Sequence, residues 1–351
     1  MAGRDPGIDR KESKHLLRTN SVFLPELLWL VFVAGIAGLI LLYPSSPEAD
    51  TRSKPVRPAN PRPTSGTHFP LTFVEGLKTA PFPLTGKDAN PRFFDMVDPK
   101  TGERFRTSRS LEPLSEREHY HDNSVLFHLP TQFKPHQPFS YVVFFHGNRS
   151  DVRQTVTEYR LTEQVNRSGK NVVLVLPQLA RNAADSSPGK FVTAQAFRTF
   201  MAEAALVLTA KLGKKHQKRL EQAPIILAAF SGGYKPLACT LDHGGTDKRI
   251  KGVVLLDGLY EDLYIFGGWL LKRSRTGFFV NIYTEGSPCE EKTMALARFL
   301  REHRLPFLET WPGEVRNGLI VLLRSPHDHL QVPLEGPPRE PLAELLRNLR
   351  N

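Results

Sequence analysis

The feature that most constrains the fold is a series of short apolar runs between residues 141 and 323. They are Tyr141–Phe145, Asn171–Leu176, Ile225–Phe230, Val253–Asp257, Phe278–Thr284 and Leu319–Leu323. These runs are nearly continuous and rich in Val, Ile and Leu, which is typical of strands buried on both faces of a parallel sheet. Segments with helical spacing separate them. The alternation predicts an α/β fold with a doubly wound, mostly parallel sheet.

Several further elements are predicted from local signals. Apolar residues at spacings of three and four predict a long helix over 197–212, and a weaker stripe begins at Val152 and stops at Gly169. Ser287-Pro288-Cys289-Glu290 has the pattern of a capping box that begins a helix. A closing helix is expected at 341–349, a hairpin over 92–107, and an additional strand at 124–129.

The composition narrows the class of protein. Hydrophobic residues make up 40% of the 351 residues and charged residues 24%, which is ordinary for a globular protein and excludes a mainly disordered or coiled-coil chain. Two cysteines exclude a disulfide-dense scaffold and a four-cysteine zinc module. The net charge of +11 favours anionic surfaces without choosing among them. A nucleic-acid reader is disfavoured because the basic residues are scattered and the domain is expected to be exported.

An apolar segment near the start of the chain predicts a membrane anchor. Leu27–Tyr43 contains no charged residue, and the apolar character extends back to Ser21 with only Glu26 interrupting it. We therefore predict a transmembrane helix at 21–43, at the lower end of the length that spans a bilayer. The alternatives are a cleaved signal peptide and a buried core helix.

The flanks of this segment predict its orientation and the division of the chain. Basic residues precede it, at Arg4, Arg10, Lys11, Lys14 and Arg18, and none follows it before Arg52. The positive-inside rule then places a basic tail, 1–20, in the cytoplasm and exports the remainder. Seven prolines between 44 and 70 predict a semi-rigid linker, followed by one catalytic domain at 71–351. A bacterial inner membrane with the domain in the periplasm is the expected location.

The most informative segment for chemistry is Ile225–Pro236, with the sequence IILAAFSGGYKP. An apolar strand runs directly into Ser231, and Gly232 and Gly233 follow before a short helix. A serine at a sharp strand-to-helix turn needs small neighbours two residues before and after it, because the backbone passes close to itself there. Ala229 and Gly233 meet that need. The alternative is a serine that merely ends a strand in a glycine turn.

This segment resembles the G-x-S-x-G nucleophile elbow of the α/β-hydrolase family, with alanine at the first glycine position. The resemblance covers about residues 120–335 and implies that Ser231 is the nucleophile. His146-Gly147-Asn148 follows the strand at 141–145, where the family begins its oxyanion loop. The resemblance implies main-chain oxyanion donors at Gly232 and at Asn148 or Gly147. Substrate contacts are expected from His146, Gly233 and Tyr234.

The family order of serine, acid and histidine leaves two candidates for each remaining role. Asp257 ends one strand and Glu285 follows the next, and we prefer Asp257 because a buried aspartate needs a partner. His327 and His329 follow the last strand, and we prefer His329, which lies deeper in the loop and is anchored by apolar neighbours. A polar loop at 177–189 is expected at the site entrance, where Asp185, Ser186 and Ser187 either bind substrate or are ordinary loop residues.

These observations predict a membrane-anchored serine hydrolase that cleaves an ester or amide bond in a small-molecule or cell-envelope substrate, without a cofactor or metal. A carboxylic ester is favoured over a peptide. A non-catalytic scaffold or binding protein of the same fold is the main alternative. A metal-dependent hydrolase is a third, because His119-x-His121 and His327-x-His329 have metal-ligand spacing. The sequence does not decide whether Cys239 and Cys289 pair.

Overall fold

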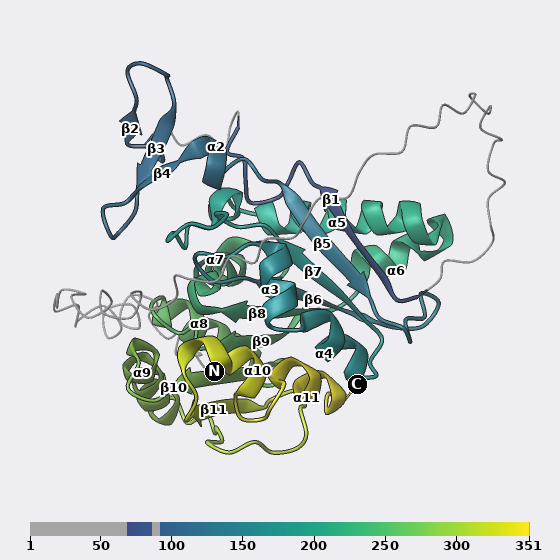
Figure 1. Cartoon of the computed structure of the whole chain (residues 1–351). Helices are drawn as coiled ribbons and strands as arrows, with labels where there is room; N and C mark the ends of the chain where they lie inside the picture. The colour runs from purple at the N-terminus through teal and green to yellow at the C-terminus, as the bar shows by residue number, and fades with distance from the viewer. Residues whose placement is uncertain (1–68, 86–91, 351) are drawn as a thin grey trace, which may run out of the picture. The chain divides into compact units, whose positions relative to one another are not determined.

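The computed structural model describes residues 69–85 and 92–350, and its main feature is an eight-stranded sheet (Figure 1). The strand order across this sheet is β1-β5-β7-β6-β8-β9-β10-β11. The strands span Leu71–Gly76 (β1), Ser124–Leu129 (β5), Ser140–Phe145 (β6), Val172–Pro177 (β7), Ile225–Phe230 (β8), Ile250–Leu256 (β9), Phe278–Thr284 (β10) and Ile320–Ser325 (β11). β1 and β5 pair antiparallel, as do β5 and β7, whereas each neighbouring pair from β7 to β11 is parallel.

The register of the parallel strands brings several strand ends to one edge of the sheet. Phe145 of β6 pairs with Ala229 of β8, and Phe230 of β8 pairs with Leu256 of β9. The residues that follow these three strands, His146, Ser231 and Asp257, must therefore lie near one another at the carboxyl edge. The pairing alone thus explains why residues far apart in the sequence meet at one site.

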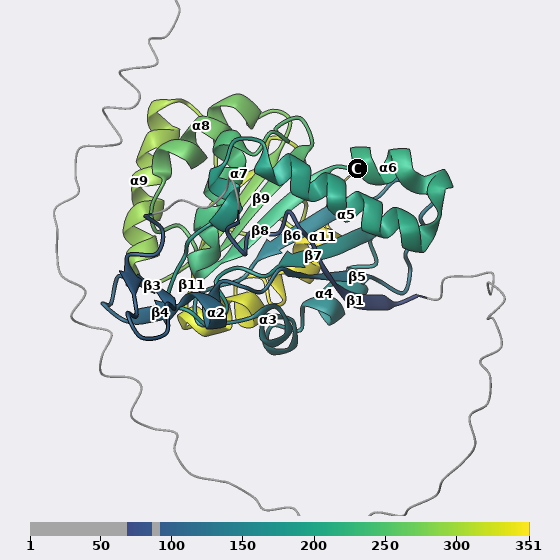
Figure 2. The same ribbon diagram turned by 90° about the horizontal axis from the view of Figure 1, so that it is seen from above.

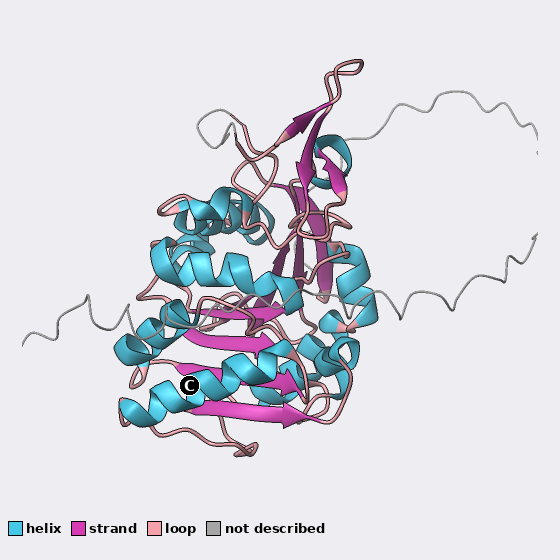
Figure 3. Cartoon of the chain, turned by 90° about the vertical axis from the view of Figure 1, so that its left-hand side faces the viewer, coloured by secondary structure: helices cyan, strands magenta, loops and turns pink. Residues whose placement is uncertain are grey.

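Helices cover both faces of this sheet, as Figures 2 and 3 show. One face carries α3 (Val152–Glu158), α4 (Leu161–Arg167), α10 (Val332–Glu335) and α11 (Pro341–Arg347). The other carries α5 (Ala196–Leu212), α6 (Gln217–Gln222), α7 (Tyr234–His243), α8 (Leu263–Arg273) and α9 (Pro288–Glu302). The described residues therefore form an α/β-hydrolase-like, mostly parallel sheet with flanking helices, as the resemblance implied.

Successive residues of the central strands enter different cores. Val142 and Phe144 of β6 pack in the core beneath α4 and α11, whereas the ring of Phe145 contacts Phe191 and Phe197 on the opposite face. Every residue of β7 and β8 is buried. Burial on both faces explains why these strands are nearly continuous apolar runs rather than alternating ones.

A small three-stranded sheet lies at the carboxyl edge of the large one. It contains β2 (Met96–Val97), β3 (Arg104–Thr107) and β4 (Pro113–Ser115), and the short helix α2 (Glu116–His119) follows it (Figure 1). Ion pairs hold it there: Arg106 binds Asp185 at 2.9 Å and Arg109 binds Glu261 at 3.3 Å. Because the loops after β7 and β9 supply the two acids, the small sheet lies over the edge at which β7 and β9 end.

The structure confirms most of the predicted elements and corrects two. β5, β8 and β10 have the predicted bounds, and β2 and β3 form the predicted hairpin. The stripe from Val152 is not one helix: α3 ends and α4 begins around Arg160, whose φ of 49° is left-handed. The predicted capping box does not form either, because the side chain of Ser287 caps nothing and instead donates to the carbonyl of Thr284.

The predicted tail, transmembrane helix and nearly all of the linker lie outside the described residues. Within residues 69–85 and 92–350, no helix is both long and apolar enough to cross a membrane.

Candidate active site

Ser231 lies at a sharp turn between β8 and α7. Its φ of 51° is left-handed, a conformation that costs energy for a residue with a side chain. The turn brings the chain so close to β6 that a Cβ on Gly233 would be 2.3 Å from the carbonyl oxygen of Phe145. Glycine is therefore required at 233 by a close backbone approach, which is the reason that the sequence suggested.

The side chain of His329 connects Ser231 to Asp257. Nε2 of His329 lies 2.9 Å from Oγ of Ser231, and Nδ1 lies 2.6 Å from Oδ2 of Asp257. The carboxylate can only accept, so Nδ1 carries a proton and Nε2 of the neutral ring accepts the hydrogen bond of the serine hydroxyl. This is the arrangement in which a histidine can remove the proton of a serine.

Asp257 is fully buried and held by several donors. Its Oδ1 accepts the amide N–H of Thr284 at 2.9 Å, and the hydroxyl oxygen of Ser287, which donates mainly to the carbonyl of Thr284, lies 3.4 Å from the same Oδ1. Burial raises the pKa of the carboxyl group, but the hydrogen bonds from His329 and Thr284 outweigh burial, and the net pKa is lowered. Asp257 is therefore ionised and able to stabilise a protonated His329.

Aromatic rings fix the plane of the His329 imidazole. The ring of Phe230 stacks on it with centroids 4.8 Å apart, and Tyr159 packs edge-on against Phe230 at 5.0 Å. Tyr260 approaches the imidazole edge-on from 6.5 Å. A side chain packed in this way cannot rotate freely, so the ring faces both Ser231 and Asp257.

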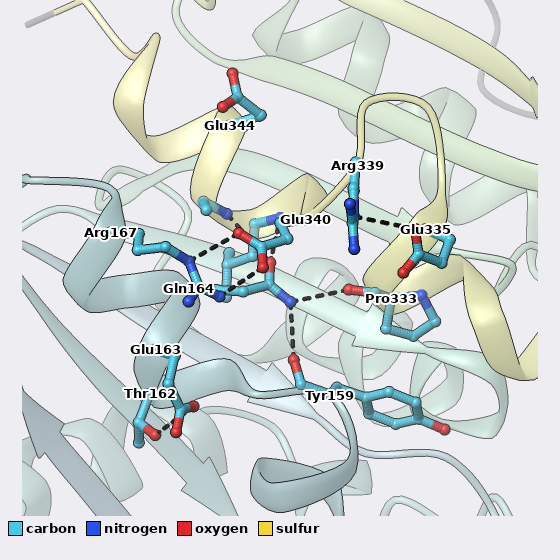
Figure 4. A network of polar contacts seen from close by, with 12 residues as sticks. Tyr159, Thr162, Glu163, Gln164, Arg167, Pro333, Glu335, Arg339, Glu340 and Glu344 are labelled. Atoms are coloured by element: carbon cyan, nitrogen blue, oxygen red, sulfur yellow. Dashed lines mark hydrogen bonds and ion pairs between the residues drawn. The ribbon is translucent and has the colours of Figure 1, made fainter.

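A buried glutamine holds the chain that follows His329. The side-chain amide of Gln164 in α4 donates to the carbonyls of Tyr159 at 2.8 Å and of Pro333 at 2.9 Å (Figure 4). Its oxygen accepts the N–H groups of Leu342 and Ala343, in the first turn of α11. Gln164 therefore joins α4 to the α10–α11 segment, and the ion pair between Arg167 and Glu340 adds an outer contact.

Two main-chain N–H groups beside Ser231 lack a hydrogen-bond acceptor among the described residues. Among the described residues, the amides of Gly232 and Asn148 donate to no backbone or side-chain acceptor. The two residues are adjacent, because a Cβ on Gly232 would be 2.1 Å from the side-chain oxygen of Asn148. Gly147 is also close-packed, and a Cβ there would be 3.1 Å from that of Ser231. Unused donors next to a nucleophile are what an oxyanion requires.

His146 lies behind this loop and is 1% exposed. Its Nε2 accepts the amide N–H of Leu179 at 3.0 Å and lies 2.9 Å from the side-chain nitrogen of Gln178. Nδ1 therefore carries the proton and donates to the carbonyl of Gly147 at 2.8 Å. Burial lowers the pKa of His146 to about 4, so the ring is neutral near pH 7. Both nitrogens bind protein groups, which makes His146 a positioning residue rather than the substrate contact expected from the sequence.

The other expected substrate contacts are also buried. Gly233 packs against the backbone of β6, and Tyr234 is 4% exposed with its hydroxyl bonded to Glu261 at 3.2 Å. We therefore assign neither residue to substrate. Of the alternative triad candidates, Glu285 is exposed and pairs with Arg324, and His327 makes no ring hydrogen bond among the described residues.

The loop over 177–189 places Ser186 beside the site, whereas its Asp185 binds the small sheet. Ser186 donates to the side-chain oxygen of Asn148 at 3.0 Å, beside Gly232. Asp185 is instead engaged by protein groups: Arg106, the hydroxyl of Tyr120 at 2.8 Å, and Ser187. The carboxylate of Asp185 thus fastens the small sheet to the loop.

Sequence reasoning missed the residues that support the site rather than react. They are Phe230, Tyr159, Gln164, Thr284 and Ser287. The available signal for Phe230 was its position directly before Ser231 in the chain. Gln164 carried a weaker signal, a polar residue within an apolar helical stripe.

Both cysteines are free thiols. Burial raises the pKa of Cys239 to about 11, and burial together with nearby Asp257 raises that of Cys289. In residues 69–85 and 92–350, no three His, Cys, Asp or Glu side chains are grouped so that they could hold a metal ion. His119, from one of the two H-x-H pairs, has Nδ1 2.7 Å from the carbonyl of Arg181.

No family model matches the sequence, and neither does any curated protein. Solved structures to which this chain is similar include a mutant feruloyl esterase module from Clostridium thermocellum complexed with sinapinate (10% identity, TM-score 0.44, covering 70% of this chain and 86% of that one). An S-formylglutathione hydrolase from Agrobacterium tumefaciens has 12% identity and a TM-score of 0.38, with 67% and 92% covered. The serine hydrolase FphF of Staphylococcus aureus has 11% identity and a TM-score of 0.40, with 65% of this chain and 91% of that chain covered. Residue roles in this chain therefore rest on its own geometry.

Proposed function

We propose that this protein is a serine hydrolase that cleaves carboxylic esters through a Ser231–His329–Asp257 triad. The observation that carries the proposal is the continuous pair of hydrogen bonds, 2.9 Å from Ser231 to His329 and 2.6 Å from His329 to buried Asp257. A purely structural serine would not need a left-handed backbone beside a stacked imidazole.

In the proposed reaction, Oγ of Ser231 forms a bond to the ester carbonyl carbon while its proton moves to Nε2 of His329. Asp257 stabilises the resulting imidazolium without taking its proton. The tetrahedral intermediate collapses, and the departing alkoxide takes the proton from Nε2 and leaves as the alcohol. Water then attacks the acyl-enzyme by the same route, giving the carboxylic acid and restoring the serine.

The negative oxygen of the intermediate would be bound by the amides of Gly232 and Asn148. Each such donor is worth about 2.7–4 kcal/mol in a transition state, because it is already oriented before charge develops. His146 contributes indirectly, since its bond to the carbonyl of Gly147 orients the peptide that carries the Asn148 N–H. No cofactor takes part in these steps.

The proposal includes a single-pass membrane anchor at 21–43, with a cytoplasmic N-terminus and an exported catalytic domain. It is supported by the uncharged run Leu27–Tyr43 and by the basic residues that precede it. A reporter enzyme that is active only outside the cytoplasm, fused after Asn351, is expected to be active. Activity of a cytoplasmic reporter alone at that position would refute the orientation.

The catalytic proposal is tested by labelling with a fluorophosphonate probe and by turnover of short p-nitrophenyl esters. The full chain in non-ionic detergent should be labelled and active, and Ser231→Ala should lose both properties while keeping its melting temperature. Ser274→Ala, at the end of α8, is the matched control and should keep both. Unchanged labelling of Ser231→Ala would remove this serine as nucleophile. A wild-type protein that neither reacts with the probe nor turns over esters or amides would favour the scaffold alternative.

A further inference from the structure

A basic pocket lies at the edge of the sheet opposite Ser231. Its volume is about 470 Å³, and it is formed where β6 and β8 begin. The lining residues are Pro138, Phe139, Lys215, Lys218, Arg219, Gln222, Ala223 and Pro224. Ser231 follows the far end of β8, so six residues at about 3.3 Å each, or about 20 Å, separate the pocket from the nucleophile.

The lining contains three cationic side chains and no carboxylate. Within residues 69–85 and 92–350, none of Lys215, Lys218 and Arg219 forms an ion pair, and all three are exposed. Arg219 does donate to the carbonyl of Pro135 at 3.1 Å. Uncompensated positive charge in a concave site attracts an anion, and planar guanidinium with flexible ammonium groups suits phosphate.

More positive charge lies behind the pocket wall. Nε of Arg249 donates to the carbonyl of Ala223, a lining residue, at 3.0 Å. Its Nη2 atom is buried without a hydrogen-bond partner among the described residues. Beside the pocket, burial lowers the pKa of His216, and the charges of Lys215 and Arg219 lower it further. Both observations are consistent with a positive potential at this edge.

The described chain begins next to this pocket. Phe69 packs edge-on against Phe133 with centroids 5.4 Å apart, and Phe133 packs against Phe139, a pocket residue, at 5.5 Å. Figure 2 shows β1 and α6 toward the same end of the domain. The preceding 68 residues, which contain the proposed anchor, therefore join the domain at the same edge as the pocket.

We propose that this pocket binds the phosphate of an anionic phospholipid headgroup and holds the amino edge of the sheet against the membrane. The inference rests on the anchoring part of the proposed function but not on the catalytic part. The shared chemistry is a phosphate ester, and a free phosphate is the other possible source. The anchor favours the headgroup, because it would tether the domain to a bilayer and the chain from the linker enters the domain beside the pocket.

The test uses the full chain in non-ionic detergent, titrated calorimetrically with glycerophosphoglycerol, glycerophosphocholine and inorganic phosphate. Glycerophosphoglycerol carries the net negative charge of an anionic headgroup, whereas glycerophosphocholine is neutral overall. Glycerophosphoglycerol should bind, with an affinity that falls as salt rises, and glycerophosphocholine should not. The triple variant Lys215→Gln, Lys218→Gln, Arg219→Gln should bind on the order of 100-fold more weakly, from about fivefold per cation.

Two further variants separate the pocket from other effects. Lys272→Gln, Arg273→Gln, Arg275→Gln removes three cations from the end of α8, which also points to the amino edge, and should bind like the wild type. The double variant at Lys215 and Lys218 keeps the Arg219 bond to Pro135 and should still weaken binding about 30-fold. Equal losses of headgroup affinity in the pocket variants and the α8 variant would mean that the anion is attracted by the overall positive charge and not by the pocket. That result would overturn the proposal.

A second arm identifies the source of the phosphate. The full chain is placed in nanodiscs that contain a photoreactive phosphatidylglycerol, and cross-linked peptides are mapped by mass spectrometry. Cross-links should fall on residues 138–139 and 215–224. Binding of phosphate in solution without cross-links there would overturn the membrane role in favour of a free anion. Ester turnover by the wild-type chain is measured in parallel. A wild-type chain that binds the headgroup but hydrolyses no ester would count against the proposed triad and not against the pocket.

Discussion

The buried His146 should make the free energy of unfolding depend on pH in a defined window. An unfolded histidine has a pKa of about 6.5, whereas burial lowers that of His146 to about 4. Between these two values the unfolded chain binds a proton that the folded protein does not. Stability therefore falls as the pH drops through this window, and the contribution of His146 is fully lost below about pH 4.

The magnitude follows from the separation of the two pKa values. One pH unit corresponds to about 1.4 kcal/mol, so the loss between pH 7 and pH 4 amounts to about 3 kcal/mol. His146→Gln removes the titrating group and leaves an acceptor for the amide of Leu179. The variant should be less stable than the wild type at pH 7, because the bond to the carbonyl of Gly147 is weakened or lost.

The assay is denaturant unfolding of the full chain in non-ionic detergent at a series of pH values from 7.5 to 4. The useful quantity is the difference in unfolding free energy between wild type and His146→Gln, because every other titrating group is common to both. We expect this difference to shift by about 3 kcal/mol against the wild type as the pH falls. A difference that stays constant to within about 1 kcal/mol would show that His146 is protonated in the folded state or that its surroundings differ from those described.

Three other outcomes are expected. Gln164→Met leaves four backbone groups without their hydrogen-bond partner and should lower the unfolding free energy by about 4 kcal/mol, at about 1 kcal/mol for each bond, as measured by thermal or denaturant unfolding. The control Gln154→Met, at an exposed position of α3, should cost under about 0.5 kcal/mol. In ester hydrolysis, Asp257→Asn should reduce kcat by on the order of 10⁴ and Glu285→Gln by less than about twofold, and the reverse order would move the acid to the loop after β10. Phe230→Leu should lower kcat about tenfold with little change in KM, since it loosens the imidazole and touches no substrate, and a change in KM alone would contradict that role.

The sheet was predictable where burial on both faces leaves a strong signal. β8 is an uninterrupted apolar run between Pro224 and Ser231, and β10 is a mostly apolar run, interrupted by Asn281, between Gly277 and Glu285, so their limits could be read directly. β1 was missed because it is a half-exposed edge strand whose sequence, LTFVEG, lacks such a run. Pairing with β5, which is remote in sequence, defines it.

The candidate site was predictable only in part, for a similar reason. Ser231, Asp257 and His329 each follow a strand, and parallel strands deliver such residues to one edge. The choice between Asp257 and Glu285 depends on which carboxylate the pairing of the strands places beside the imidazole of His329. The local sequence does not contain that information. The supporting residues Phe230 and Gln164 act through contacts with segments up to 179 residues away, so no local pattern marks them.

The hydrogen bond from the amide of Thr284 to Asp257 also ties the site to the alignment of two strands. Asp257 follows β9 and Thr284 is the last residue of β10, and 2.9 Å separates the Thr284 nitrogen from the carboxylate. Because this donor is a main-chain N–H, only proline at 284 would remove it. A shift in the pairing of β9 and β10 would instead move the carboxylate away from its donor, so the position of the acid depends on the register of the sheet.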